Sequence, residues 1–200
     1  MWALQDPDFE PFAWYKFGSI FADDELEKIE KIKNNQREKL GHGDVANNTL
    51  DRSIRRSKVS FIDIDEDSEW LYRKMAGMVN DVNQFNYNFT LDSIYPLQYG
   101  LYDSKDEGFY NWHPDANIQG NRYKLIRKLS FSILMSKKTD FEGGELLFNF
   151  GVPNNDKLDT VELDQYDVVF FPSFYAHKVN TVTKGVRESI VGWIAGPVWQ

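Results

Sequence analysis

Two of the chain's three histidines lie in segments whose spacing suits a metal ion. His113 and Asp115 are two residues apart, and side chains two apart on an extended strand point to the same face. His177 can supply a third ligand from a distant strand. Two neutral imidazoles and one carboxylate on one face of a cation leave coordination positions open for reactants. The sequence therefore predicts a metal ion at which chemistry takes place.

A basic and a hydroxyl side chain follow the last of these ligands. Arg187 comes ten residues after His177, and Ser189 two residues later, so both point the same way on a strand. A planar guanidinium makes two charge-assisted hydrogen bonds to a carboxylate. We expect Arg187 and Ser189 to hold the far carboxylate of a dicarboxylic cosubstrate. His-x-Asp alone is a weak motif, and its specificity comes from this ordered context.

The ordered set resembles the motif of the 2-oxoglutarate and Fe(II)-dependent dioxygenases, and within them the prolyl 4-hydroxylase or PKHD-type group. The resemblance runs over about residues 97–197 and is carried by His113, Asp115, His177, Arg187 and Ser189. It implies Fe(II), 2-oxoglutarate and O2, with ascorbate as a candidate further cofactor. It also implies hydroxylation of an unactivated C–H bond, with an exposed proline of a protein or peptide as the substrate.

The same resemblance assigns further residues to the cosubstrate pocket, namely Tyr102, Tyr110, Ser130, Val179 and Trp193. Tyr102 lies eleven residues before His113, near the place of a family tyrosine that bonds the metal-binding end of 2-oxoglutarate. Tyr110 matches a family aromatic residue. Regular strand alternation, however, puts Tyr110 on the face opposite His113, so plain packing in the sheet explains it equally well.

Other functions remain open on the residues alone. A hydrolytic zinc site can also use two His and one Asp, although it has no need of an Arg-x-Ser pair. A non-catalytic jelly-roll binding module would explain the strands but not the ordered ligands. For the dioxygenase chemistry, a free amino acid, another small molecule or a nucleobase are alternative substrates.

Composition limits the class of protein. Two hundred residues, 42% apolar and 16% aromatic, suffice for the core of one domain. A net charge of −8 disfavours broad binding to nucleic acids or anionic membranes. No run approaches the ~18 apolar residues of a membrane span, and residues 1–8 lack the basic and apolar regions of a signal peptide. We expect a cytoplasmic protein without disulfides, because the chain has no cysteine. Its oligomeric state is left open.

Two further polar features have a bland and a functional interpretation. Arg52, Arg55, Arg56 and Lys58 form the densest basic cluster of this acidic chain. They can be a solvated strand edge or a patch that faces the substrate. His42 lies between two glycines, where a solvated loop residue is the simpler interpretation and a ligand role is the alternative.

The elements that must position these residues change in kind near residue 94. Before it, we expect a strand or packing arm within 9–20, a helix over about 25–40 that Gly41 ends, a strand at 59–64 and a helix at 67–85. After it, short β-branched and aromatic segments alternate with turns. The expected strands are 94–102, 109–115, 127–136, 145–150, 157–163, 168–172, 177–182 and 186–194.

About eight such strands suit a jelly roll, and the family resemblance implies the same fold, a double-stranded β-helix. The predicted fold class is therefore mainly β (α+β), with N-terminal helices bracing one sheet. We expect a single dioxygenase domain over residues 1–200. In it, residues 1–93 form a helical or mixed support and residues 94–197 form the jelly-roll catalytic core.

Overall fold

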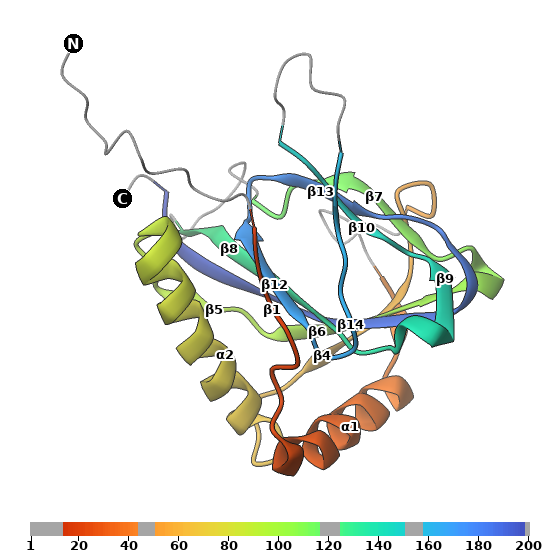
Figure 1. The fold of residues 1–200 in the computed structure, drawn as a ribbon, viewed down its shortest axis with the longest axis horizontal. Helices are drawn as coiled ribbons and strands as arrows, with labels where there is room; N and C mark the ends of the chain where they lie inside the picture. The colour runs from red at the N-terminus through yellow and green to blue at the C-terminus, as the bar shows by residue number, and fades with distance from the viewer. Residues whose placement is uncertain (1–13, 44–50, 117–124, 151–157, 199–200) are drawn as a thin grey trace.

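A computed structural model describes residues 14–43, 51–116, 125–150 and 158–198. Two antiparallel β-sheets face each other, and two helices cover the outer face of the larger sheet (Figure 1). This arrangement confirms the expected mainly β fold, a jelly roll with N-terminal bracing helices. Residues 9–13, the loop at 117–124 and the turn at 153–155 lie outside the described residues.

The larger sheet has the strand order β1-β12-β8-β14-β6-β4-β2, with β5 and β9 also pairing with β14. Its strands are β1 (Tyr15–Phe17), β2 (Gly41–His42), β4 (Lys58–Ile62), β5 (Ser93–Ile94), β6 (Leu97–Asp103), β8 (Leu125–Leu134), β9 (Phe141–Gly143), β12 (Val168–Pro172) and β14 (Val182–Pro197). The long strand β14 lies between β8 and β6 at the centre of this sheet, so residues on β14 are shielded on both sides.

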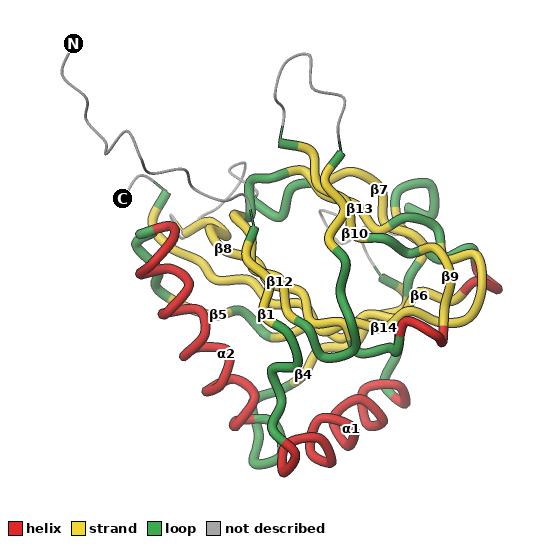
Figure 2. Tube along the Cα trace, in the orientation of Figure 1, coloured by secondary structure: helices red, strands yellow, loops and turns green. Residues whose placement is uncertain are grey.

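The smaller sheet has the order β11-β10-β13-β7-β3, and Figure 2 shows its central strands β10, β13 and β7 next to one another. Its strands are β3 (Arg55–Arg56), β7 (Phe109–His113), β10 (Leu146–Asn149), β11 (Asp159–Val161) and β13 (Ala176–Val179). In the described ranges, short helical turns lie at Asn83–Tyr87, Ser104–Asp106 and Lys138–Asp140.

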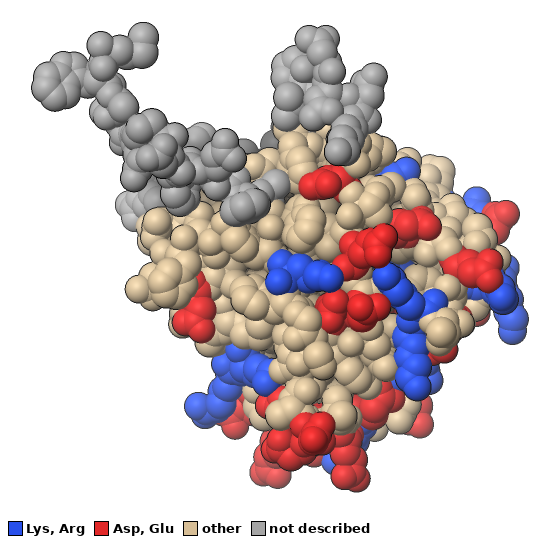
Figure 3. Space-filling view, in the orientation of Figure 1, with Lys and Arg blue, Asp and Glu red and all other residues tan. Residues whose placement is uncertain are grey.

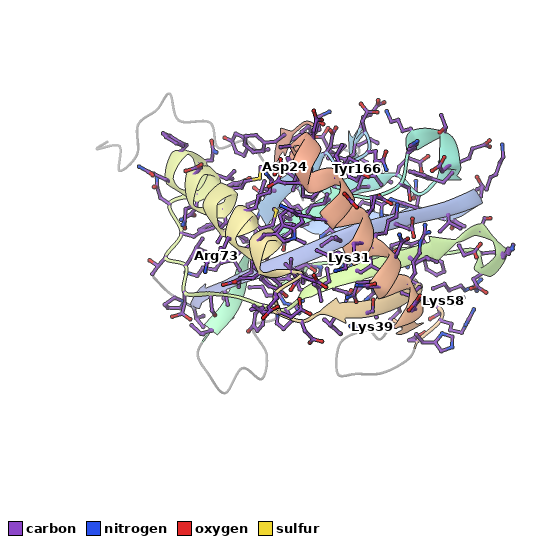
Figure 4. The ribbon with its side chains drawn as sticks, turned by 90° about the horizontal axis from the view of Figure 1, so that it is seen from below. Asp24, Lys31, Lys39, Lys58, Arg73 and Tyr166 are labelled. Atoms are coloured by element: carbon purple, nitrogen blue, oxygen red, sulfur yellow. The ribbon has the colours of Figure 1, made fainter. Side chains whose placement is uncertain are left out.

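Helices α1 (Asp23–Glu38) and α2 (Glu69–Val82) lie across the larger sheet (Figure 4). The side chain of Glu25 accepts a hydrogen bond from the Ala22 N–H at 2.9 Å, which satisfies one of the free donors at the start of α1. Each helix turns an apolar stripe to the sheet, with Ile29 and Ile32 on α1 and Leu71 and Met75 on α2. Within the described chain, neither helix is long and apolar enough to cross a bilayer.

The central strands of the larger sheet are buried on both faces, and their side chains alternate between two cores. On β12, Val168 and Phe170 pack under the helices, whereas Val169 and Phe171 fill the space between the sheets. Side chains of an extended strand alternate in direction, which explains why every residue of β12 is buried. The functional residues of the larger sheet must therefore lie on its inner face.

Several expected boundaries shift. The helix expected to end at Gly41 ends at Glu38, and Gly41 with His42 forms β2 instead of a loop. The strand expected over 94–102 is interrupted at Pro96, because proline has no N–H for the ladder. Strand β9 was not expected, since three residues give too short a pattern to recognise.

An ion pair between the exposed Arg37 and the buried Glu188 joins α1 to the central strand. Glu188 on β14 is 3% exposed and accepts from Arg37 Nε at 2.5 Å and from Arg37 Nη2 at 2.6 Å. The Tyr99 hydroxyl donates to the same carboxylate. The hydrogen bonds to Glu188 raise the pKa of Arg37. This pair fixes the outer side of β14 directly behind Arg187 and Ser189.

We predict that Arg37→Met lowers the free energy of unfolding by about 2 kcal/mol, because it leaves the Glu188 carboxylate buried with one partner fewer. Lys31→Met is the matched control, since Lys31 on the same helix makes an exposed ion pair with Asp67 and should cost less than about 1 kcal/mol. Urea denaturation followed by circular dichroism measures both. Equal losses in the two variants would contradict the importance of the Arg37–Glu188 pair.

Candidate metal and cosubstrate site

The three expected metal ligands meet at one end of the smaller sheet. Strands β13 and β7 pair so that His177 lies directly opposite His113, and Asp115 follows in the turn after β7. The ligand atoms of the three residues all lie within 4.8 Å of one another. The Asp115 carboxylate is 3.8 Å from His113 Nε2 and 3.6 Å from His177 Nε2. The three side chains are thus close enough to bind one cation.

Both imidazoles present the same nitrogen to the shared space. His113 Nδ1 lies 2.7 Å from the Asn111 carbonyl oxygen, and His177 Nδ1 lies 3.0 Å from the Tyr175 carbonyl oxygen. A carbonyl oxygen can only accept, so Nδ1 carries the proton in each ring. The lone pair of each Nε2 is left free for a metal, which is the usual arrangement of ligating histidines.

The carboxylate is held by a buried pair of serines. Ser130 Oγ donates its hydrogen to Asp115 Oδ2 at 2.8 Å. Because a hydroxyl has a single hydrogen to donate, Ser130 Oγ must accept the hydrogen bond from Ser173 Oγ at 2.8 Å. The Ser173 carbonyl also accepts from the N–H groups of Asp115 and Ala116, at 2.8 and 2.9 Å. Asp115 was expected on a strand. It lies instead in a turn that this carbonyl stabilises.

Ser173 is fully buried and is the residue of the site that the sequence did not indicate. Its partners Asp115 and Ser130 lie 58 and 43 positions away in the chain, so no short spacing marks it. Ser130 was expected to line the cosubstrate pocket. Its observed contact is with a predicted metal ligand.

The charge state of the ligands suits a divalent cation. Burial, together with the nearby His177, lowers the pKa of His113 to about 4, so this imidazole is neutral at pH 7. Burial by itself raises the pKa of Asp115, but His177, His113 and Arg127 together with the Ser130 hydroxyl bring it below its ordinary value. A neutral imidazole and an ionised carboxylate are the forms that bind metals.

The predicted anion-binding residues lie on the inner face of the larger sheet. Arg187 on β14 is 3% exposed, and its Nη1 donates to Ser189 Oγ at 3.4 Å. Its guanidinium carbon lies 5.7 Å from the ring centre of Tyr102, directly across on β6. Within the described chain, Arg187 takes part in no salt bridge, and burial lowers its pKa although Tyr102 and the more distant Glu145 act in the opposite direction. A buried cation with no carboxylate in direct contact is costly, so the arrangement fits an anionic ligand.

The remaining predicted pocket residues flank the cation site. Trp193 on β14 lies across from Ser130 on β8, and Val179 on β13 lies across from Tyr110 on β7. The guanidinium carbon of Arg127 lies 4.0 Å from the ring centre of Trp193. The ring of Trp193, with the Arg127 guanidinium against it, therefore lies next to the predicted ligands.

Tyr110 lies on the same side as His113, which corrects the expectation from regular alternation. Their rings stack at 3.5 Å between centres, with planes 16° apart. The cause is a β-bulge, because the four residues of β7 from Tyr110 to His113 lie opposite only three residues of β13, from Val179 to His177. The extra residue on β7 turns the following side chains to the other face.

The basic cluster at residues 52–58 is neither a plain solvated edge nor a free positive stripe. Arg55 points inward, whereas Arg56 and Lys58 pair with Glu107 and Asp106 at 2.5 and 3.6 Å. The surface pocket that the cluster lines also contains Asp103. On the face drawn in Figure 3, Lys and Arg side chains of the described residues similarly lie among Asp and Glu.

Comparisons with known proteins agree with this geometry. A model of the 2OG-Fe(II) oxygenase superfamily matches residues 97–195. A PKHD-type hydroxylase of Idiomarina loihiensis is 34% identical over 92 residues, which cover 46% of this chain and 39% of that protein. A PKHD-type hydroxylase of Crocosphaera subtropica is 31% identical over 101 residues, which cover 50% and 43%. The matched part is thus well under half of the length of these relatives.

Solved structures resemble more of the chain. A Trichoplax adhaerens prolyl hydroxylase, solved in complex with a hypoxia inducible factor peptide fragment, gives a TM-score of 0.70 at 17% identity and covers 91% of this chain and 83% of its own. A Pseudomonas putida prolyl-4-hydroxylase gives 0.69 at 20% identity, covering 90% and 91%. At these identities the likeness shows the fold.

We predict that Asp115→Ala and His177→Ala each reduce divalent-cation binding by at least tenfold, because each removes one of three ligands. Titration calorimetry with Mn²⁺ measures the affinity. His42→Ala is the control, since this third histidine is exposed on β2 and lies apart from the cluster. Wild-type affinity in either ligand variant would show that the cation binds elsewhere.

Removing the buried Arg187 side chain should weaken binding of 2-oxoglutarate and not of the metal ion. Arg187→Ala is expected to weaken 2-oxoglutarate binding at least tenfold, equivalent to about 1.4 kcal/mol, with Mn²⁺ affinity nearly unchanged. Lys184→Ala provides a control from the same strand, because Lys184 is exposed and pairs with Glu142 at 2.7 Å. If the two variants bind 2-oxoglutarate equally well, the anchor lies elsewhere, and Arg127 is the next residue to test.

Proposed function

The chain belongs to the 2OG-Fe(II) oxygenase superfamily, and from this membership we propose that it hydroxylates a prolyl residue of a protein or peptide. The observation that carries the proposal is the cluster of His113, Asp115 and His177 beside the buried Arg187. A cation site and an unpaired cationic side chain together suit a ligand with a metal-binding end and a distal carboxylate.

Each part of the site has a role in this reaction. His113, Asp115 and His177 would hold Fe(II), and Arg187, Ser189 and Tyr102 would bind 2-oxoglutarate. Bound Fe(II) supplies the oxidative chemistry, in which 2-oxoglutarate and O2 give succinate and CO2 while a substrate C–H bond becomes C–OH. Ascorbate is the proposed reductant that keeps the iron ferrous.

The protein's own contribution is to orient the reactants and to exclude water. His177 is packed against the rings of Phe171 and Phe148, at 4.8 and 5.8 Å between centres. Arg187 is buried on the inner face of the larger sheet. These surroundings shield both ends of the proposed cosubstrate from solvent, which strengthens its electrostatic contacts.

The substrate side supports a peptidyl proline. The ring of Trp193 lies across from Ser130, which contacts Asp115, and an apolar ring such as that of proline packs well on an aromatic face. Arg127 stacks on Trp193 and carries several N–H donors, which suit the carbonyl groups of a peptide. Relatives named PKHD-type hydroxylases and prolyl hydroxylases of the same fold support the same substrate class.

The other functions receive less support. A zinc hydrolase or a binding module has no use for the buried Arg187 beside the ligands. A nucleic acid substrate is disfavoured by the net charge of −8 and by the acidic partners of Arg56 and Lys58. A cysteine-free chain suits the cytoplasm. Residues 1–200 would act as one domain, because β3 and β4 extend the sheets that carry the site.

We predict that the protein, incubated with Fe(II), 2-oxoglutarate and ascorbate, adds one oxygen atom to proline-containing peptides and forms succinate in equal amount. Mass spectrometry of peptides from a tryptic digest, with unstructured proline-containing peptides added, measures the gain. Matched peptides with alanine in place of proline are the control. Methylated oligonucleotides and free proline run in parallel. Oxygen gained only by an oligonucleotide or by free proline would contradict the peptidyl substrate.

A further inference from the structure

We infer that Arg55 is a positioning residue, which holds the imidazole of His113 in its metal-binding orientation through the ring of Tyr110. The inference rests on the cation site of the proposed function, but not on the identity of the substrate. This role would explain why Arg55, unlike its neighbours Arg56 and Lys58 in the basic cluster, is buried.

Arg55 is anchored on two sides. It is 7% exposed, its Nε donates to Ser57 Oγ at 2.6 Å, and its Nη2 donates to Gln98 Oε1 at 2.9 Å. Gln98 is on β6 of the larger sheet, whereas Arg55 is on β3, the edge strand of the smaller sheet. The guanidinium therefore has a fixed position between the two sheets.

The Arg55 guanidinium, the Tyr110 ring and the His113 imidazole are connected by two successive contacts. Arg55 lies directly across from Tyr110 in the β3–β7 pair, and its guanidinium carbon is 4.6 Å from the centre of the Tyr110 ring. The Tyr110 ring is in turn stacked on the His113 imidazole at 3.5 Å. A guanidinium is attracted to the π face of an aromatic ring, so Arg55 stabilises the observed position of the Tyr110 ring.

His113 depends on this stack more than the other two ligands do. Asp115 is held by Ser130 and by the main chain of Ser173. His113 has a hydrogen bond from Nδ1 to its own strand, at Asn111, which does not by itself fix the rotation of the ring about its side-chain bonds. Contact with the flat face of Tyr110 supplies the missing restraint.

The bulge in β7 and the alternation of β3 make this contact possible. Without the extra residue in β7, Tyr110 and His113 would face opposite ways. On β3, Arg55 points inward, while its neighbour Arg56 points outward to Glu107 and to the ring of Phe109, at 5.5 Å from its centre. Arg56 is thus a matched control in the same strand.

The test uses Co²⁺ in place of iron, because its visible absorption reports the arrangement of its ligands. We expect Arg55→Met to weaken Co²⁺ binding about tenfold, as loss of an outer contact of a metal ligand commonly does, and to change the visible spectrum. Arg56→Met should leave both within twofold of wild type. A residue with a merely structural role would lower the unfolding midpoint without changing the spectrum of the bound ion.

Variants of the middle ring show whether Arg55 acts through it. Tyr110→Phe keeps the stacking face and should keep wild-type Co²⁺ affinity, whereas Tyr110→Leu should weaken it about tenfold. In the double variant, Arg55→Met added to Tyr110→Leu should cause no further loss, because coupled residues are not additive. Additive losses, or unchanged Co²⁺ affinity and spectrum in Arg55→Met, would overturn the inference.

Arg55→Lys covers the case in which Arg55→Met does not fold. It keeps the charge but loses the planar fork, so we expect weaker Co²⁺ binding with an unchanged circular dichroism spectrum, and unchanged binding would again overturn the inference. Failure of the proposed function is recognised separately. If His177→Ala binds Co²⁺ as wild type does, the cation site itself is wrong, whereas an unhydroxylated peptide with intact Co²⁺ binding contradicts only the substrate.

Discussion

The alternation of side chains along β14 is the constraint on which the rest of the structure depends. Arg187, Ser189 and Trp193 face the smaller sheet, whereas Glu188, Ile190 and Ile194 face the helices. A slip of one residue would exchange these two sets, placing apolar side chains in the site and Arg187 under the helices. The register is held by β8 and β6 on either side and by the ion pair of Glu188 with Arg37. The helix side of the sheet therefore sets the geometry of the site side.

Asp115 and Arg187 are buried charges of opposite sign in the space between the sheets, and they are compensated differently. Asp115 has two imidazoles and a serine hydroxyl around it, so its neighbours already favour the ionised form. Arg187, among the described residues, contacts Ser189 and the ring of Tyr102 and has Glu145 only at longer range. The three predicted ligands would leave coordination positions open on a bound cation, and Arg187 lacks an anion in direct contact within the described ranges. A dicarboxylate bound to the metal at one end would satisfy both, which is why these two features support one proposal.

The extent of similarity to known proteins differs between sequence and fold for a physical reason. The family model matches residues 97–195, whereas the solved prolyl hydroxylases cover about nine tenths of the chain. The residues before 97 mainly supply α1, α2 and the strands beside β6, which bury the outer face of the larger sheet. Many apolar sequences of suitable volume can do this. Metal and carboxylate recognition, by contrast, requires particular side chains, so the similarity in sequence is found where these residues lie.

The sequence by itself determined the ligand types, the Arg-x-Ser pair, both helices and most strands, because these depend on side-chain chemistry and on periods of two or 3.6 residues. Only the tertiary structure decided that His177 lies opposite His113, that a bulge turns Tyr110 onto His113, that Ser173 holds Asp115, and that Arg55 leaves its basic neighbours to point inward. Each of these depends on pairing between strands far apart in the chain. Local periodicity contains no information about such pairing or about a single extra residue in one strand, so the ligands could be predicted from the sequence and the contacts that orient them could not.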